Sequence, residues 1–460
     1  MLPLFAVPRF EVQRIEGTAV RHRKRIVALA YPVYFELLAG VAAGIINMVW
    51  VAHLGGAAVA AVAVATNVEN VLLGVILMAG SGTTVLVARA RGAEDPGAVR
   101  AAVRGGWALC ALLVPPVAIG GYVLREPLAR LVIGGGTPAA LAAGYFAISL
   151  PGMAVHFGTN LLDGVLKGAG DTRTPMRLAF LANGLILVLD PVLIDRYGIR
   201  GAALATVIGR SAALAAGLVA LRRNPVLRAA GKAPASRPLL AALRLTARTG
   251  LPMSADFVVR MAGALAMVAV VARLGVTAVA AYGIATKAMY VATMAFYAVR
   301  QAAAIHTAQL LGAGQDERRA VGRQALLVSG AVGTAAAVLL LGTASWIMRA
   351  FGGDPEVADA GALFLRCLGP YLVLLACFIA LGGVFEGSGG SPLVARITAA
   401  GSVVQLPLAY GLSGLGLPGI CLAMALAMGV QYAALARLFG RTAPGRRRGQ
   451  DPRSALSGSG

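Results

Sequence analysis

Charged side chains are scarce in this chain. They make up 13% of its 460 residues, whereas soluble domains average about 25%. Hydrophobic residues make up 58%, the mean hydropathy is +0.78, and apolar runs recur at the length of a membrane span. This composition argues against an Ala-rich soluble helical protein and predicts a polytopic membrane protein.

Acidic residues are fewer than half as numerous as basic ones. The chain has 19 Asp and Glu against 41 Lys and Arg, a formal net charge of +22. Such a charge could indicate nucleic acid, but the basic residues collect in short segments between apolar runs and at both termini, as the positive-inside rule expects. We therefore expect contact with membrane lipid and none with nucleic acid. We also expect a multi-pass protein of the bacterial inner membrane with both termini in the cytoplasm.

Cysteine and histidine are also scarce. The four cysteines lie in apolar segments without the paired spacing of metal ligands, and the four histidines form no zinc motif. The sequence shows no nucleophile and base pair, no phosphate-binding glycine loop followed by lysine, and no recognisable channel filter. These absences argue against an enzyme and a passive channel, and we expect no metal and no cofactor.

Polar residues interrupt an otherwise apolar stretch at residues 156–209. In the run LANGLILVLDPVLI, Asp190 falls at the centre of a span, where a carboxylate costs about 2.5 to 3.5 kcal/mol on insertion scales. Pro191 has no N–H to offer the carbonyl of Leu187, so a polar gap opens beside the carboxylate. Asn183, about two turns earlier, shares that face. Asp190 is thus a candidate proton site, with a structural aspartate bonded to the freed backbone as the alternative.

Other polar residues also share helix faces. Asn160 and Asp163 lie three residues apart before the turn KGAGDTRTP. Asp163 is either a second proton site or a residue near the cytoplasmic mouth. Glu36 lies on one face with Asn47, about 16 Å away along the axis. Glu36 either receives protons or substrate from the cytoplasm or makes a structural hydrogen bond.

A substrate cavity is expected between the two halves of the chain. We expect the basic residues of its C-terminal half to be buried in protein or in a wet cavity rather than in lipid. They either neutralise Asp256, which Arg260 follows by one helical turn, or present positive charge to an anionic substrate. The residues expected to line the cavity are Asn160, Thr206, Glu69, Asp256, Arg260, Lys287 and Arg300.

The second half of the chain repeats the first. Identical or similar residues recur 220 positions apart without a gap, among them Pro32 and Pro252, and Glu36 and Asp256. Basic loops mark the same side in both copies, so the repeat is parallel, about an axis along the membrane normal. Six spans in each half predict an all-helical membrane protein of twelve transmembrane helices in two pseudo-symmetric six-helix bundles.

The repeat also predicts the organisation of the chain. We expect a monomer with five segments. These are a cytoplasmic arm (1–25), an N-terminal bundle (26–221), a cytoplasmic linker that carries only basic charges (222–250), a C-terminal bundle (251–440) and a basic, disordered tail (441–460).

Four sequence elements carry a resemblance to a known family. They are HLGGAAVAAVAVAT after the first span, LKGAGDTRTPM after the fourth, and LDPVLI and GAALATVIG in the fifth and sixth. Together with glycine echoes in the second half, they resemble the multidrug and toxic compound extrusion (MATE) family, whose superfamily includes polysaccharide and lipid-precursor flippases. The resemblance implies two six-helix bundles in a V that export amphipathic, often cationic drugs in exchange for protons or sodium.

Within this family the chain is similar to the DinF-like branch, whose coupling network lies in the N-terminal bundle. Asp190 matches the aspartate of its fifth helix, and Asp163 fills a polar position of its fourth. Asn47 stands where the first helix normally carries an aspartate. The acidic positions of the NorM-type branch match Arg260 and Leu375, which argues against a cation site in the C-terminal bundle.

We therefore predict a secondary active exporter of small amphipathic, cationic compounds that works by alternating access. Protonation of Asp190 rearranges the N-terminal bundle and loosens the drug. One alternative is sodium coupling, through a weak site at Asp190, Asn47 and Asn183. Another is a lipid-linked precursor or polysaccharide flippase, because Arg and Lys of the C-terminal half suit phosphate head groups. The residues expected to carry coupling are Asp190, Asp163, Asn47, Asn183 and Glu36.

Overall fold

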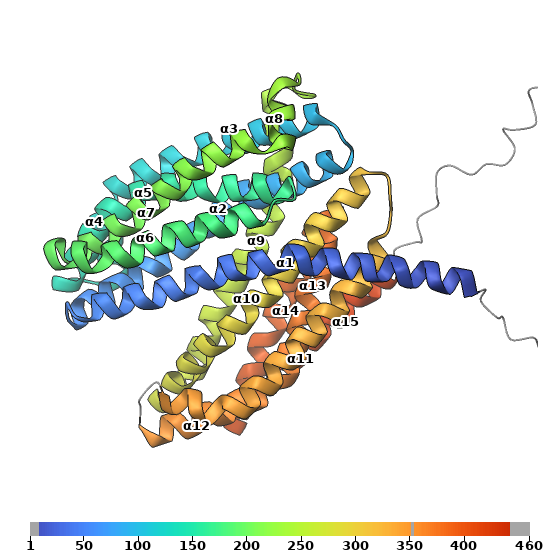
Figure 1. Ribbon diagram of the computed structural model, residues 1–460. Coiled ribbons are helices and arrows are strands. Elements are labelled where there is room, and N and C mark those ends of the chain that lie inside the picture. The colour runs from blue at the N-terminus through green and yellow to red at the C-terminus, as the bar shows by residue number, and fades with distance from the viewer. Residues whose placement is uncertain (1–8, 351–353, 442–460) are drawn as a thin grey trace, which may run out of the picture.

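A computed structural model of the protein describes residues 9–350 and 354–441, and these residues form helices and no strand. Figure 1 shows two lobes of long helices joined at one side. The N-terminal lobe contains α1 (Arg9–Ala52), α2 (Gly56–Gly92), α3 (Pro96–Val123), α4 (Arg125–Ile133), α5 (Thr137–Gly168), α6 (Arg173–Tyr197) and α7 (Ile199–Arg223).

The C-terminal lobe has the same order of elements. A short helix, α8 (Pro225–Lys232), lies between the lobes. The lobe itself contains α9 (Leu239–Ala272), α10 (Val276–Gly312), α11 (Arg318–Ala350), α12 (Pro355–Cys367), α13 (Gly369–Ser388), α14 (Ser391–Leu412) and α15 (Gly416–Arg441), with a 3-10 turn, Ser413–Leu415, between the last two.

Twelve of these helices have the length and composition of membrane spans. Among the described residues, eleven segments are long and apolar enough, and the last of them, Ser391–Arg441, contains both α14 and α15. The short helices α4 and α12 follow the third span of each lobe. The predicted fold class, an all-helical membrane protein of two six-helix bundles, is confirmed.

Helix boundaries reproduce the internal repeat. Both α2 and α10 are 37 residues long, and their first residues lie 220 positions apart. Each follows a glycine with a positive φ, 97° at Gly55 and 103° at Gly275, a conformation that side chains with a Cβ rarely adopt. The Leu-Gly pairs of the sequence are therefore the turns that start the second helix of each repeat.

The first helix begins earlier than the apolar run suggests. We expected it to start near Ile26 after an arm at residues 1–25, but α1 is already helical at Arg9. Tertiary packing occurs within this extension, since His22 is 1% exposed and contacts His306 of α10. The predicted tail at 441–460 lies outside the described residues beyond Arg441.

Glycines bring the two lobes into close contact on one side. A Cβ at Gly92 would clash with the carbonyl oxygen of Gln309, and a Cβ at Gly312 would clash with that of Arg89. These contacts are repeat-related, because both pairs lie 220 residues apart. A Cβ at Gly82 would likewise lie 2.6 Å from the carbonyl oxygen of Thr246. Small residues thus let the helix backbones meet, as in other membrane bundles.

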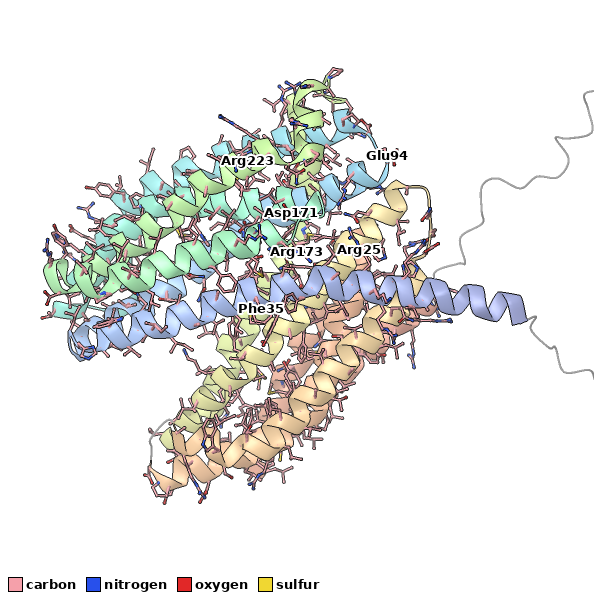
Figure 2. All side chains as sticks on the ribbon, viewed as in Figure 1. Arg25, Phe35, Glu94, Asp171, Arg173 and Arg223 are labelled. Atoms are coloured by element: carbon pink, nitrogen blue, oxygen red, sulfur yellow. The ribbon has the colours of Figure 1, made fainter. Side chains whose placement is uncertain are left out.

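The opposite ends of the lobes diverge. The glycine contacts lie in the half of α2 that ends at Gly92, in the starting half of α9 and at the end of α10. The ends of the lobes that carry α4 and α12 lie apart in Figure 1. In Figure 2, Arg25 and Glu94 lie toward the joined side. The molecule is a V that is closed on the side of α8 and of the start of α1. It is open on the side of α4 and α12.

Candidate functional site

A buried carboxylate in α6 contacts the first helix. The amide Nδ2 of Asn47 donates a hydrogen bond of 2.9 Å to Oδ2 of Asp190. Asp190 is 1% exposed, and its other oxygen, Oδ1, has no hydrogen-bond partner among the described residues. A buried carboxylate oxygen without a donor is unfavourable as an anion and is relieved by a proton or a cation. The arrangement can therefore bind and release a proton.

Pro191 lies inside α6, directly after this carboxylate. Because proline has no N–H, the carbonyl of Leu187 loses its helical donor. An ionised carboxylate only accepts hydrogen bonds, so Asp190 cannot serve this carbonyl unless it is protonated. The alternative of a structural aspartate bonded to the freed backbone thus itself requires a proton on Asp190.

The candidate sodium ligands are only partly brought together. Asn47 donates its amide nitrogen to Asp190, and its oxygen would face a cation only after rotation of the amide group. Asn183 is half-buried on α6, and the structure contains no hydrogen bond between it and Asp190. One carboxylate and a donating amide form a poor cage for a cation but a suitable setting for a proton.

A second acidic cluster joins α1 to α5. Nζ of Lys167 lies 2.7 Å from Oε1 of Glu36, and these side chains are 9% and 12% exposed. Asp163, one turn before Lys167, interacts electrostatically with both. Glu36 thus pairs with the ammonium group, and Asp163 places a second carboxylate near the same pair. We had not selected Lys167 from the sequence, because it stands in the apparent turn motif LKGAG.

The motif GAGDTRTP that follows this cluster has a structural role. Gly170 has a φ of 79°, and the side chain of Asp171 accepts hydrogen bonds from the backbone N–H and the hydroxyl of Thr174 at the start of α6. Asn160, in the preceding helix, lies in the contact between α5 and α2, where a Cβ at Gly80 would clash with its Oδ1. Asn160 therefore packs two helices together.

A small cavity inside the N-terminal lobe collects polar groups from three helices. Glu69 of α2, Ser149 of α5, and Thr206 and Arg210 of α7 line it. Its volume of about 10 Å³ suits a single water. The structure thus brings Glu69 and Thr206 together, but in a space too small for a drug. Arg210 was missed from the sequence because nothing in an apolar helix marks which acid it faces.

The C-terminal lobe holds a closed ionic network. Asp256 is 3% exposed and accepts hydrogen bonds from Arg300 at 2.7 Å, Arg260 at 3.1 Å and the Thr398 hydroxyl at 2.6 Å. Arg300 also donates to Glu386 at 2.5 Å. The pairing that spacing suggested for Arg260 is present. Glu386 was not anticipated, because it is distant in sequence from the other members.

Lys287 does not follow the expectation of burial. It is exposed on α10, and the structure contains no ion pair or hydrogen bond for it among the described residues. It stands on the open part of α10, away from the glycine contacts, so no partner helix covers it. Of the three basic residues expected in the C-terminal half of the cavity, two therefore belong to the network and one is free.

A pair of histidines connects the lobes on the closed side. Nδ1 of His22 in α1 lies 2.9 Å from Nε2 of His306 in α10, and Nε2 of His22 lies 2.8 Å from Glu317, just before α11. His22 and His306 are 284 residues apart, and no local motif marks either. These polar contacts, together with the glycine packing, hold the two lobes together on the closed side of the V.

Known proteins share this architecture. The MatE family model matches residues 32–192 and 252–411, one match for each lobe. A probable multidrug resistance protein NorM of Thermotoga maritima is 25% identical over 423 residues, covering 88% of this chain and 87% of that protein. The DNA damage-inducible protein F of Escherichia coli is 31% identical over 218 residues, 45% of each chain, which gives loose support to the DinF-like branch.

A solved structure has the same fold. It is described as the outward-facing conformation of a multidrug resistance MATE family transporter of the MOP superfamily. It superimposes with a TM-score of 0.84 at 21% identity and covers 91% of this chain and 96% of that one. Since the family model matches most of both lobes, the chain belongs to the MatE family.

Proposed function

We propose that this protein is an exporter that expels small amphipathic, cationic compounds from a bacterium in exchange for protons. Family membership and the names of its relatives, which include multidrug resistance proteins, support the export of drug-like compounds. We place the chain in the inner membrane as a monomer, with its termini and the closed side of the V in the cytoplasm. In this assignment the described conformation opens outward.

The buried pair of Asp190 and Asn47 carries the proposal for proton coupling. Ionised Asp190 attracts a cationic compound to the N-terminal lobe. A proton entering from the open side neutralises the carboxylate at Oδ1, which removes this attraction and the charged hydrogen bond to Asn47. Because the two states of Asp190 differ in their contacts between α1 and α6, protonation shifts the balance between conformations.

The driving force depends on the charges exchanged. One proton entering for one monovalent cation leaving moves no net charge, so the membrane potential, worth about 2.3 kcal/mol per charge at 100 mV, does not contribute. The pH gradient then supplies the energy. We propose protons rather than sodium, because sodium needs several oxygen ligands and the site has one carboxylate, with no hydrogen bond between Asp190 and Asn183.

The network in the C-terminal lobe bears on the flippase alternative. That alternative depended on free positive charge for phosphate head groups, but Arg260 and Arg300 are engaged by Asp256 and Glu386. Only Lys287 is left without a partner among the described residues of this group. We therefore retain the exporter as the proposed function.

Everted vesicles test this proposal. Efflux of a fluorescent lipophilic cation should respond to an imposed pH gradient and not to a sodium gradient. The variant Asp190→Asn should abolish the response, and Asp195→Asn, an exposed aspartate on the same helix, is the matched control. A monodisperse size-exclusion profile shows that both variants fold. Undiminished coupled efflux by folded Asp190→Asn would reject the role of this carboxylate.

A further inference from the structure

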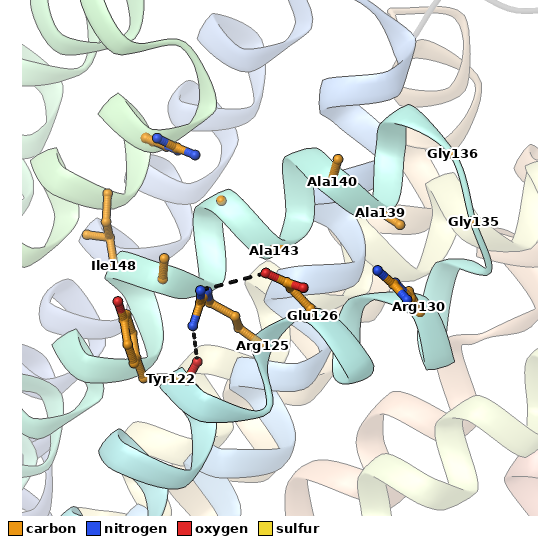
Figure 3. Close-up of a pocket in the computed structure, with 13 residues that line it drawn as sticks. Tyr122, Arg125, Glu126, Arg130, Gly135, Gly136, Ala139, Ala140, Ala143 and Ile148 are labelled. Atoms are coloured by element: carbon orange, nitrogen blue, oxygen red, sulfur yellow. Dashed lines mark hydrogen bonds and ion pairs between the residues drawn. The ribbon is translucent and has the colours of Figure 1, made fainter.

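A cavity that contains none of the candidate coupling residues lies on the open side of the N-terminal lobe. It has a volume of about 720 Å³ and is bounded by the end of α3, by α4, by the start of α5 and by Arg200 at the start of α7. Figure 3 shows Arg125, Glu126 and Arg130 around it. Its arginines lie on the short helix α4 and at the first turn of α7, so we place them at the level of the membrane surface.

The cavity carries an excess of positive charge. Three arginines and one glutamate line it. Arg125 donates to the carbonyl of Tyr122 at 2.8 Å and lies 3.7 Å from Glu126, whose side chain is 59% exposed. Arg130 and Arg200 have no ion pair or hydrogen bond among the described residues. Two guanidinium groups are thus free to bind an anion.

The position of these arginines differs from the general distribution of basic residues along the sequence. Basic residues gather in the loops on the closed side. These arginines lie on the opposite side, where the positive-inside rule does not explain them. The side chain of Arg200 also packs closely against Gly144 of α5. A Cβ added at Gly144 would lie 3.0 Å from Nε of Arg200. A local ligand would explain both features.

Exposed apolar side chains that are close in sequence to the lining residues, outside the cavity itself, indicate the kind of anion. Leu131 of α4 is 82% exposed, and Val123 at the end of α3 is 65% exposed. A soluble anion would not need these neighbours, but the acyl chains of a lipid would cover them. Guanidinium groups bind phosphate through paired, charge-assisted hydrogen bonds. The cavity is also wider than a free phosphate requires.

We propose that this cavity binds the phosphate of an anionic phospholipid headgroup. The unpaired Arg130 and Arg200 supply the positive charge that attracts the headgroup, and Arg125, stacked at 4.5 Å on the ring of Tyr122, adds a third guanidinium group to the lining. The acyl chains lie along Leu131 and Val123. The site would tie α4, α5 and α7 to one leaflet of the membrane.

Native mass spectrometry of the full chain tests this site. The probes are phosphatidylglycerol, phosphatidylcholine as the zwitterionic comparison, and inorganic phosphate. The wild type should retain phosphatidylglycerol in preference to phosphatidylcholine. Arg130→Gln and Arg200→Gln should each weaken this retention about tenfold, the loss expected for one charge-assisted hydrogen bond. Arg196→Gln, an exposed arginine at the same end of the lobe that does not line the cavity, should leave it unchanged.

A second variant separates a lipid from a soluble anion. Leu131→Ser keeps the charges and removes an acyl contact, so it should weaken the retention of phosphatidylglycerol. Millimolar inorganic phosphate should not displace the bound lipid. Displacement by inorganic phosphate, or equal retention by wild type and the double arginine variant, would overturn the proposal.

Discussion

One position of the internal repeat carries a positive side chain in the N-terminal lobe and a negative one in the C-terminal lobe. In the N-terminal lobe Glu36 of the first span pairs with Lys167 of the fourth. In the C-terminal lobe the repeat-related residues are Asp256, 220 positions on, and Glu386, which aligns with Lys167 in the glycine-rich echo. The first span keeps its carboxylate, whereas the fourth exchanges a cation for an anion.

In the C-terminal lobe the positive charge of Arg300 offsets the repulsion between two neighbouring carboxylates. It bridges Asp256 and Glu386 and stands 220 positions after Gly80. In the N-terminal lobe the space beside Gly80 is filled by Asn160, whereas glycines of α13 make room for Arg300 in the other lobe. The same fold therefore accommodates a neutral packing contact in one copy and a buried ionic bridge in the other.

The two lobes also differ in the balance of their buried charges. In the C-terminal network two carboxylates meet two guanidinium groups, so the charges balance. The N-terminal lobe has two carboxylates for the one ammonium of Lys167, and it adds the buried Asp190. The residue equivalent to Asn47 is Met267, which is 2% exposed in an apolar core, and α14 contains no acidic residue. The proposed proton coupling therefore places its residues in the N-terminal lobe.

The largest expected effect follows from removing the bridge. Arg300→Met leaves Asp256 and Glu386 facing each other without this cation, and breaking a buried pair costs about 3–5 kcal/mol. Thermal unfolding in detergent, followed by a dye that reacts with buried thiols such as Cys110, should show a large loss of stability. Arg349→Met, an exposed arginine of α11, is the control. Equal melting of both variants would show that the bridge is not needed.

A smaller loss is expected at the equivalent place in the N-terminal lobe. Lys167→Met leaves Glu36 and Asp163 without this cation, and we expect a loss of about 3 kcal/mol, because Lys167 makes one ion pair where Arg300 makes two. Protonation neutralises the two carboxylates, so the loss should shrink at acidic pH. The exposed Lys232→Met is the control for the thermal melts. A loss independent of pH would contradict the unpaired carboxylates.

Exchanging the residues at one repeat position should separate coupling from stability. Asn47→Met gives the N-terminal lobe the residue of the C-terminal one and removes the donor to Asp190. We expect a sharp fall in pH-driven efflux, with a stability loss of about 1.5–3 kcal/mol for a hydrogen bond to a charged group. Met267→Asn should lower stability by about 1–3 kcal/mol through an unsatisfied buried amide, without loss of coupling in the folded fraction. Comparable losses of coupling would remove the distinction between the lobes.

Sequence alone predicted the architecture because two signals extend over the whole chain. Apolar runs of spanning length fix the number of helices, and the 220-residue register fixes the relation of the lobes. Asp190 could be singled out because a carboxylate in an apolar run is costly wherever the fold places it. Its partner Asn47 was accessible only through the family resemblance.

Partners across helices could not be predicted. Glu36 and Lys167 are separated by 131 residues, and His22 and His306 by 284. The spacing within one helix identified Arg260 as a partner of Asp256, but it could not show that Arg300 and Glu386 complete the network. Whether a basic residue in an apolar segment is paired or exposed depends on how the helices rotate against one another. Hydropathy does not carry that information.

The smallest effect is expected at the residue that the C-terminal network leaves out. Lys287 is exposed and unpaired among the described residues, so Lys287→Gln should change stability by no more than about 0.5 kcal/mol. For an exporter of cations, removal of this charge should leave pH-driven efflux of a fluorescent cation intact. Binding of an anionic amphiphile, measured by fluorescence in parallel, should be weak in the wild type and weaker in the variant. If the variant instead abolished efflux of the cation, the C-terminal lobe would take part in substrate handling through charge, and the division of work between the lobes would fail.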